Sequence, residues 1–292
     1  MRIKLLIVFT FLAVTFSVNA QNEWDADNAV GNFSNCNNWY STCPSTWNGT
    51  TDLLFQYRNN ASQTSLYFDL GGWKDVRNFQ FTNTYGQSTP LNGDGNGFNI
   101  YGKLENYSSW YQAINVPTSF KGGSVEINPV NADMVMNAVI YNNGNKPINI
   151  YGSNGKLITF NNFIEGDSSV NMNINQYSKV AIAADMTSKS PAAFSGGVII
   201  NIGELWINSG GKLNGGNITL GGNNNVCKLY INAVDGTQVS NPVIVANNSG
   251  STQIIGSFRT SGTNEYTGTV TLNRDVTFET GGGGTPRDKG VE

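Results

Sequence analysis

The sequence predicts an all-β protein, a right-handed β-solenoid (β-helix) with an aromatic-rich N-terminal cap. Three observations support this prediction. Short runs of β-branched and aromatic residues recur along the chain, each closed by Gly, Asn, Ser or Asp. Double glycines begin at positions 196, 210, 215 and 221, and the step from Ile200 to Leu220 is about twenty residues, the length of one solenoid coil. Gly and Asn also tolerate the left-handed backbone that coil corners need, and asparagines can form hydrogen-bonded ladders between coils.

Composition and charge exclude several classes of function. Only 13% of the residues are charged, against about 25% in an average domain, and about forty Asn residues supply surface polarity instead. The net charge of -3 gives no basic field for phosphates, so no nucleic-acid partner is expected. The complete absence of His excludes Ser-His-Asp and Cys-His catalytic units and the commonest transition-metal ligand. We expect no cofactor.

Residues 1–20 have the pattern of a signal peptide. Arg2 and Lys4 give a positive start, residues 5–16 form an apolar run, and Ala20 closes a triplet of the kind that signal peptidase reads. The run of about twelve residues is shorter than the roughly 20 that cross a bilayer, and no second run of that length follows. We therefore expect cleavage before Gln21 and export of a mature chain without a transmembrane segment.

Residues 21–111 are expected to form the aromatic-rich N-terminal cap and the first coils. Five of the six tryptophans lie here with many tyrosines. Flat aromatic faces stack on sugar rings, so these tryptophans are candidate glycan-binding residues. Alternatively they form the cap itself, because a solenoid end exposes strand edges and apolar core that must be covered. We favour the cap, although both interpretations can hold for different members of the set: Trp24, Trp39, Trp47, Trp73 and Trp110.

The three cysteines fit an oxidising destination. Cys36 and Cys43 enclose a short loop that Pro44 follows at once, and we predict a disulfide between them. Cys227 lies in a strand pattern and is predicted to be a buried thiol. Without His or a CxxC pair, no zinc site is expected.

Residues 112–280 are predicted to form the β-solenoid. Alternation within the strands places Ile148 and Ile150 on one face and Asn149 on the other. Two phrases also recur, residues 99–102 as 149–152 and residues 120–123 as 194–197, which suggests stacked units. A β-sandwich or jelly roll is the alternative, although these usually show stronger alternation at a spacing of about 8 to 12 residues. The predicted strands are 125–127, 135–141, 148–151, 157–160, 170–174, 180–183, 198–202, 205–207, 218–220, 229–231, 243–245, 254–255 and 270–278.

Short motifs at both ends resemble exported β-helical passenger proteins with autotransporter-associated β-strand repeats. The opening matches are Trp24-Asp25, Asn38-Trp39, Pro44 and the D-x-x-F of residues 52–55, and residues 262–273 (GTNEYTGTVTLN) are similar to the repeat itself. The resemblance implies a surface-displayed right-handed β-helix, secreted or on the outer cell surface of a Gram-negative-like bacterium, that serves in adhesion, aggregation or surface architecture. It leaves the secretion route open, because residues 281–292 are expected to be a flexible Gly-rich tail or a truncated end.

The leading hypothesis is therefore a passenger or adhesin-like module with a binding or structural role toward a polysaccharide or cell-surface ligand; the sequence indicates no oligomeric state. A polysaccharide-acting β-helix enzyme, lyase or glycosidase, is the second hypothesis, and a glycan-binding module that uses the N-terminal aromatics is the third. The enzyme requires a groove where two acidic residues and a Lys or Arg converge, and Asp167 with Asp185 is one conceivable pair. The glycan binder requires two or more exposed, coplanar aromatics.

Residues 92–97 partly match the pattern of a calcium-binding loop. Their N-x-D-x-N-G order matches part of an EF-hand loop, yet Lys103 stands where a bidentate Glu is required. A tight turn explains the same residues, and no metal site is predicted.

Overall fold

A computed structural model describes residues 21–24, 31–40, 43–56, 65–142, 146–153, 155–165, 171–187, 194–221, 225–233, 236–247, 251–258 and 263–281. The predicted signal peptide, Asp167 and residues 282–292 lie outside these ranges.

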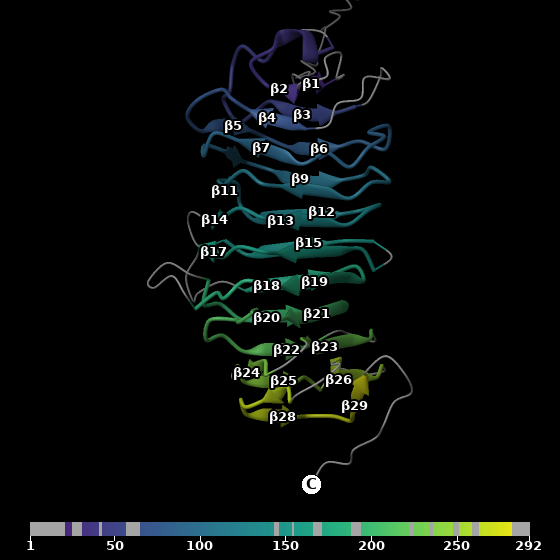
Figure 1. Cartoon of the computed structure of the whole chain (residues 1–292). Coiled ribbons are helices and arrows are strands. Elements are labelled where there is room, and N and C mark those ends of the chain that lie inside the picture. Colours follow the sequence, from purple (N-terminus) through teal and green to yellow (C-terminus); the bar gives the residue numbers. More distant parts are fainter. Residues whose placement is uncertain are drawn as a thin grey trace, which may run out of the picture.

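The described chain winds into a β-solenoid whose coils stack along one axis, as predicted (Figure 1). All the strand pairings within its sheets are parallel, and each coil adds one strand to sheet A and one to sheet B. Sheet A contains β1 (Gln21–Trp24), β3 (Asp52–Phe55), β6 (Phe79–Phe81), β9 (Lys103–Asn106), β12 (Val125–Pro129), β15 (Ile148–Tyr151), β18 (Met172–Asn175), β20 (Val198–Ile200), β22 (Ile218–Leu220), β25 (Val243–Val245) and β28 (Val270–Leu272).

Sheet B forms the second face of the solenoid. It contains β2 (Gly31–Asn32), β4 (Leu66–Phe68), β7 (Leu91–Gly93), β10 (Gln112–Ile114), β13 (Met134–Met136), β16 (Leu157–Phe160), β19 (Ser178–Ile182), β21 (Gly203–Asn208), β23 (Cys227–Asn232), β26 (Gln253–Phe258) and β29 (Val276–Gly281).

A third face, sheet C, has five strands among the described residues. It contains β5 (Lys74–Val76), β8 (Phe98–Ile100), β11 (Thr118–Phe120), β14 (Ile140–Asn142) and β17 (Ile164–Glu165). Two further strands, β24 (Gln238–Val239) and β27 (Glu265–Tyr266), pair near the C-terminal end, and a short 3-10 helix, η1 (Cys36–Asn38), lies near the N-terminal end.

The register between coils gives the repeat length. Ile200 pairs with Leu220, so the predicted twenty-residue step is one coil. Other coils are longer: Ile148 pairs with Met172 and Val243 with Val270. The corner loops absorb these differences, because the sheets stack in register while the connections vary in length.

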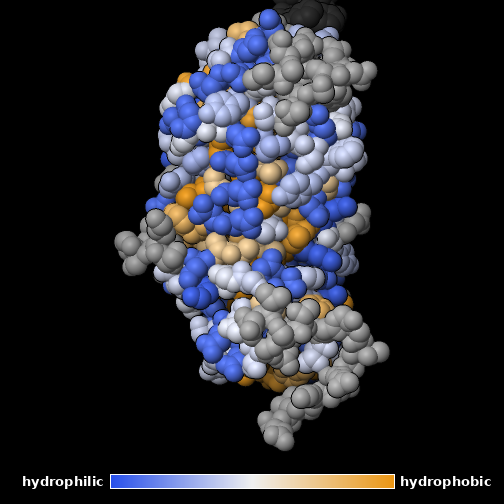
Figure 2. Space-filling model, in the orientation of Figure 1, coloured by the Kyte–Doolittle hydropathy of each residue, from blue (hydrophilic) through white to orange (hydrophobic). Residues whose placement is uncertain are grey.

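The core is a column of inward-facing side chains. Ile148, Ile150, Met172 and Ile174 are buried, and the intervening asparagines face outward, which confirms the predicted alternation. Aromatic rings are concentrated in the core of the N-terminal coils, whereas Ile, Val, Leu and Met predominate in the core of the later ones. The outer surface shows hydrophilic residues down the middle of the visible face, flanked by patches of more hydrophobic ones (Figure 2).

Asparagine ladders connect the coils, as the composition predicts. Asn115 Nδ2 donates to Asn92 Oδ1 at 2.7 Å, Asn137 to Asn115 at 2.7 Å, and Asn161 to Asn137 at 2.8 Å. Asn115 and Asn137 each donate to one neighbour and accept from the other, so the ladder links four successive coils along sheet B. Further amide pairs join Asn149 with Asn173, Asn175 with Asn201, and Asn208 with Asn232.

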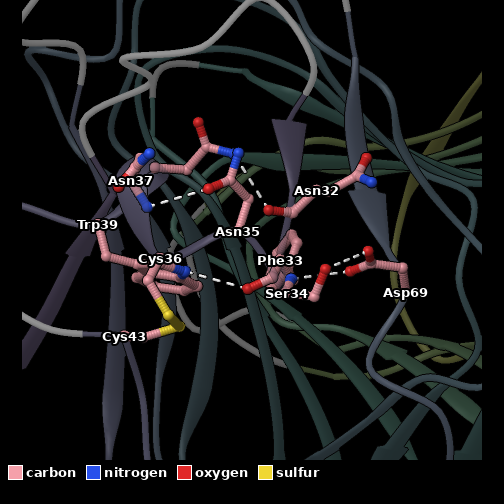
Figure 3. Close-up of a disulfide and its surroundings, with 10 residues drawn as sticks. Asn32, Phe33, Ser34, Asn35, Cys36, Asn37, Trp39, Cys43 and Asp69 are labelled. Atoms are coloured by element: carbon pink, nitrogen blue, oxygen red, sulfur yellow. Dashed lines mark hydrogen bonds between the residues drawn. A yellow bond between two sulfur atoms is a disulfide. The ribbon is translucent and has the colours of Figure 1, made fainter.

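An aromatic cluster caps the N-terminal end. Trp24 lies with its ring centroid 5.0 Å from Phe33 and 4.9 Å from Trp39, in an edge-on arrangement with the latter. Trp39 Nε1 donates to the carbonyl of Phe33 at 3.1 Å, so the indole N–H is satisfied inside the cap. Cys36 and Cys43 form a disulfide beside this cluster (Figure 3).

Two sequence expectations about the repeat were wrong in detail. Residues 135–141 do not form one strand, because the chain turns between β13 and β14 and Asn137 joins the ladder. Residues 270–278 are likewise divided between β28 and β29. The recurring segment 99–102 begins in sheet C whereas 149–152 begins in sheet A. Similar short sequences therefore occupy different faces of the coil.

Candidate functional site

The structure separates the five candidate tryptophans into three groups by exposure. Trp24 and Trp39 are 0% and 5% exposed, so they belong to the cap and present no face to a ligand. Trp47 is half-buried against the core. Trp73 and Trp110 are 39% and 50% exposed and lie on the surface of the first coils. Only these last two are placed where a sugar ring could stack on them.

Trp73 belongs to an aromatic group on the outer face of sheet C. It directly precedes β5, while Tyr141 lies in β14, three strands further along the sheet. Their ring centroids are nevertheless 5.6 Å apart, edge to face. Three strand spacings amount to about 14 Å, so the two side chains lean toward one another over β8 and β11. Ser119 of β11 is accordingly buried although it points outward.

Polar groups lie beside these rings. Asn99 Nδ2 donates to Asp75 Oδ1 at 2.6 Å, and the exposed Tyr101 has its hydroxyl 3.3 Å from Asp75 Oδ2. Desolvation, helped by the charge of Asp75, raises the pKa of Tyr101, so this hydroxyl keeps its proton and donates. We call Trp73, Tyr101, Tyr141, Asp75 and Asn99 the aromatic strip.

Two glycines permit close backbone approach at the strip. A Cβ on Gly49 would approach the Tyr101 ring to 2.8 Å, so the ring rests directly on backbone. Gly97 is aligned with Trp73 between neighbouring coils, and a Cβ there would lie 1.7 Å from the Pro117 carbonyl oxygen. The strip therefore depends on close backbone approach beneath the aromatic rings.

A second candidate is a groove of about 400 Å³ on the outer face of sheet A. Lys103 and Glu105 come from β9, and Glu126 and Asn128 from the adjacent β12. We call this the carboxylate groove; its remaining lining residues are Tyr107, Val130, Tyr151, Ser153 and Gln176.

The two carboxylates of the groove, Glu105 and Glu126, have different contacts. Lys103 Nζ lies 3.2 Å from Glu126 Oε2, and this hydrogen bond is the main reason that the pKa of Lys103 is raised. Asn128 Nδ2 donates to Glu105 Oε1 at 3.0 Å, and the Tyr107 hydroxyl lies 3.4 Å from the same oxygen. Glu105 and Glu126 stand diagonally on neighbouring strands, which places their Cα atoms about 7–8 Å apart.

The other acidic candidates do not assemble a site. Asp185 pairs with Lys212 at 2.9 Å, while its proposed partner Asp167 lies outside the described residues. Of residues 92–97, the first two end β7 and 94–97 form the turn to β8, in which Asp94 Oδ1 accepts from the Asn96 backbone at 3.1 Å. Within the described ranges, no three His, Cys, Asp or Glu side chains gather as a metal site requires.

Comparison with family models, curated proteins and solved structures found no match to this chain. In the described part of the chain, no helix has the length and apolar character needed to cross a bilayer.

The sequence identified Trp73 and Trp110 as candidates, but it did not predict the aromatic strip or the carboxylate groove. Tyr141 lies 68 positions from Trp73, and only the coil register brings them together. Glu105 and Glu126 lie on neighbouring coils. Their spacing of 21 residues is close to one coil, so it could have predicted that they lie near each other once the repeat length was known.

Proposed function

We propose that this protein is an exported, surface-displayed β-solenoid that binds polysaccharide through the aromatic strip. The single observation that carries the proposal is the edge-to-face contact of the exposed Trp73 with the half-buried Tyr141 on sheet C, with hydroxyl-binding groups beside it; the two rings are not coplanar. Sugar rings present apolar C–H faces that stack on aromatic rings, while their hydroxyls need donors and acceptors of the Asp75, Asn99 and Tyr101 type.

Two further features support this proposal. A solenoid is a rigid, elongated scaffold with repeated outer faces, which suits binding to a chain-like ligand. The N-terminal signal pattern and the resemblance to passenger proteins support export and an adhesive or architectural role at the cell surface.

The test is binding of the mature chain to a panel of insoluble and soluble neutral polysaccharides, with Trp73→Ala and Tyr141→Ala as site variants. Trp110→Ala is the matched control, because Trp110 is also an exposed tryptophan but lies outside the strip. We expect the two strip variants to bind at least tenfold more weakly, a loss of about 1.4 kcal/mol, and the control to bind normally. Equal binding by all three variants would refute the proposal.

A polysaccharide-cleaving enzyme is the second candidate function, and the carboxylate groove specifically favours it. Hydrolysis of a glycosidic bond needs one carboxyl that protonates the leaving oxygen and one carboxylate that activates water or attacks the sugar. Glu105 and Glu126 supply the two groups on one face, with Lys103 beside them.

Release of reducing ends from the same panel tests this second function. We expect Glu105→Gln and Glu126→Gln each to abolish release while strip-dependent binding persists. Release that survives both substitutions would exclude the groove as a catalytic site.

A further inference from the structure

The corner between sheets A and B contains a cleft that the proposed function does not use. Its origin is a difference in loop length. The connections from β18 to β19 and from β20 to β21 have two residues each, whereas those before and after, 152–156 and 221–226, are longer. A cleft of about 490 Å³ lies beside these short turns, and Gly155 and Val226 of the longer connections line it.

Side chains of four successive coils line this cleft. Gly155 and Val226 belong to the flanking loops, Tyr177 to the first short turn, and Lys179, Glu204 and Lys228 to β19, β21 and β23. Gly203 forms part of the floor, with φ at +132°, and a Cβ there would lie 2.2 Å from the Ser178 carbonyl oxygen. The close packing of the two short turns thus requires glycine at this position.

The first short turn is strained. Gln176 and Tyr177 have φ values of 55° and 61°, and such left-handed conformations cost non-glycine residues energy. Gly or Asn would suit this turn better. The strained turn instead presents the Tyr177 ring, 59% exposed, at the edge of the cleft. Strained residues that display a side chain in a cleft are a reason to look for a ligand.

The charges in the cleft are unbalanced toward positive. Glu204 is the single carboxylate among the lining residues, with Lys228 Nζ at 3.1 Å and Lys179 Nζ at 3.8 Å. Trp206 Nε1 donates to the same carboxylate at 2.8 Å and Lys179 lies over the Trp206 ring, which fixes the arrangement. Two ammonium groups against one carboxylate leave a local charge of +1 in a chain of net charge -3.

The two lysine side chains of the cleft are accessible to a ligand. The Lys179 and Lys228 side chains are 37% and 32% exposed, whereas that of Glu204 is 13% exposed and lies beneath them. Each ammonium has three donors, and Glu204 occupies only part of this capacity. An anion above Glu204 would lie between both lysines.

We propose that this cleft binds an anionic saccharide, with its carboxylate or sulfate held by Lys179 and Lys228 and its ring stacked on Tyr177. Charge-assisted hydrogen bonds from two lysines provide the anion specificity, and the exposed aromatic ring provides affinity for the sugar face. The site lies at the corner between sheets A and B whereas the aromatic strip lies on sheet C, so binding at the two sites can be tested separately.

Isothermal titration calorimetry of the mature chain tests the proposal with three probes of similar length. These are an oligogalacturonate, its methyl-esterified and therefore uncharged form, and a sulfated neutral-backbone oligosaccharide. We expect the oligogalacturonate, the sulfated probe or both to bind, with affinity that falls as salt rises, and the methyl ester to bind at least tenfold more weakly. Binding of the oligogalacturonate alone assigns the site to carboxylated sugars, and of the sulfated probe alone to sulfated sugars.

Variants decide whether the cleft is responsible. We expect Lys179→Gln with Lys228→Gln to reduce anionic binding at least tenfold. Lys212→Gln, which removes an exposed lysine outside the cleft, should leave binding unchanged. Tyr177→Asn relieves the strained turn while it removes the ring, so it should fold well and still bind more weakly; Tyr177→Phe should bind normally.

Two results would overturn the proposal. One is the absence of binding by either anionic probe at millimolar concentration. The other is anionic binding that persists in the double lysine variant. Because Trp73→Ala affects only the strip, a failure of the cleft proposal leaves neutral polysaccharide binding intact, and the reverse also holds.

Discussion

Truncation of Trp24 should destabilise the N-terminal cap without any effect on ligand binding. Trp24 is fully buried and its ring contacts Phe33, Trp39 and Phe55 with centroid distances of 5.0, 4.9 and 5.9 Å. A Trp24→Ala variant removes the indole and leaves a cavity that these packed rings cannot fill by small shifts.

The magnitude follows from the burial of the side chain. A buried aromatic removes about 200 Å² from water, and at about 25 cal/mol per Å² this corresponds to about 5 kcal/mol as an upper bound. Alanine retains part of this burial, so the expected loss is about 3–5 kcal/mol, the usual range for large aromatic truncations in cores.

Urea denaturation followed by circular dichroism measures the loss, and hydrogen exchange resolved by peptide locates it. Solenoid coils contact mainly their neighbours, so the destabilisation should be greatest in β1–β4 and fade along the axis. Trp110→Ala, which truncates an exposed tryptophan, should stay within about 0.5 kcal/mol. A Trp24→Ala variant as stable as Trp110→Ala would refute the cap.

Three further predictions concern the packing of the coils, the asparagine ladder and pH. Gly97→Ala should destabilise strongly or prevent folding because its Cβ would meet the Pro117 carbonyl, whereas Gly123→Ala, with open space around its Cβ, should fold with near-normal stability; thermal melts compare the two. Asn137→Ala removes two ladder hydrogen bonds at an exposed site and should cost about 1 kcal/mol, measured as a lower urea midpoint with an unchanged m-value. Burial raises the pKa of Tyr85 to about 12, so its contribution to stability is complete below about pH 10 and is lost as pH rises toward 12. With no His in the chain, unfolding free energy should be nearly constant from about pH 6 to 9 and fall above pH 10; a marked change between pH 6 and 8 contradicts this assignment.

The fold was predictable because its determinants are local. Strand length, alternation of Ile with Asn, and Gly at corners are all visible in single coils, and β15, β16, β22 and β25 match their predicted ranges. The strand ends were less predictable where apolar residues continue through a corner. Residues 135–141 read as one strand because Val139 remains apolar after the chain has turned.

The candidate sites depend on the register between coils, which the amino-acid sequence alone does not determine. Trp24 and Trp73 look alike in the sequence, yet one fills the end of the core and the other lies on sheet C. The residues around the cleft at Tyr177 come from four successive coils, so no single sequence motif predicts it. Only the alignment of the coils converts such scattered residues into surfaces.

Hydrogen exchange with and without a bound neutral polysaccharide tests the central claim most directly. We expect slower exchange in β5, β8, β11 and β14, the strands beneath the aromatic strip, and unchanged exchange in the cap around Trp24 and Trp39. The same protection should disappear in Trp73→Ala. Protection confined to other parts of the solenoid, or protection that persists in Trp73→Ala, would contradict the assignment of polysaccharide binding to the aromatic strip.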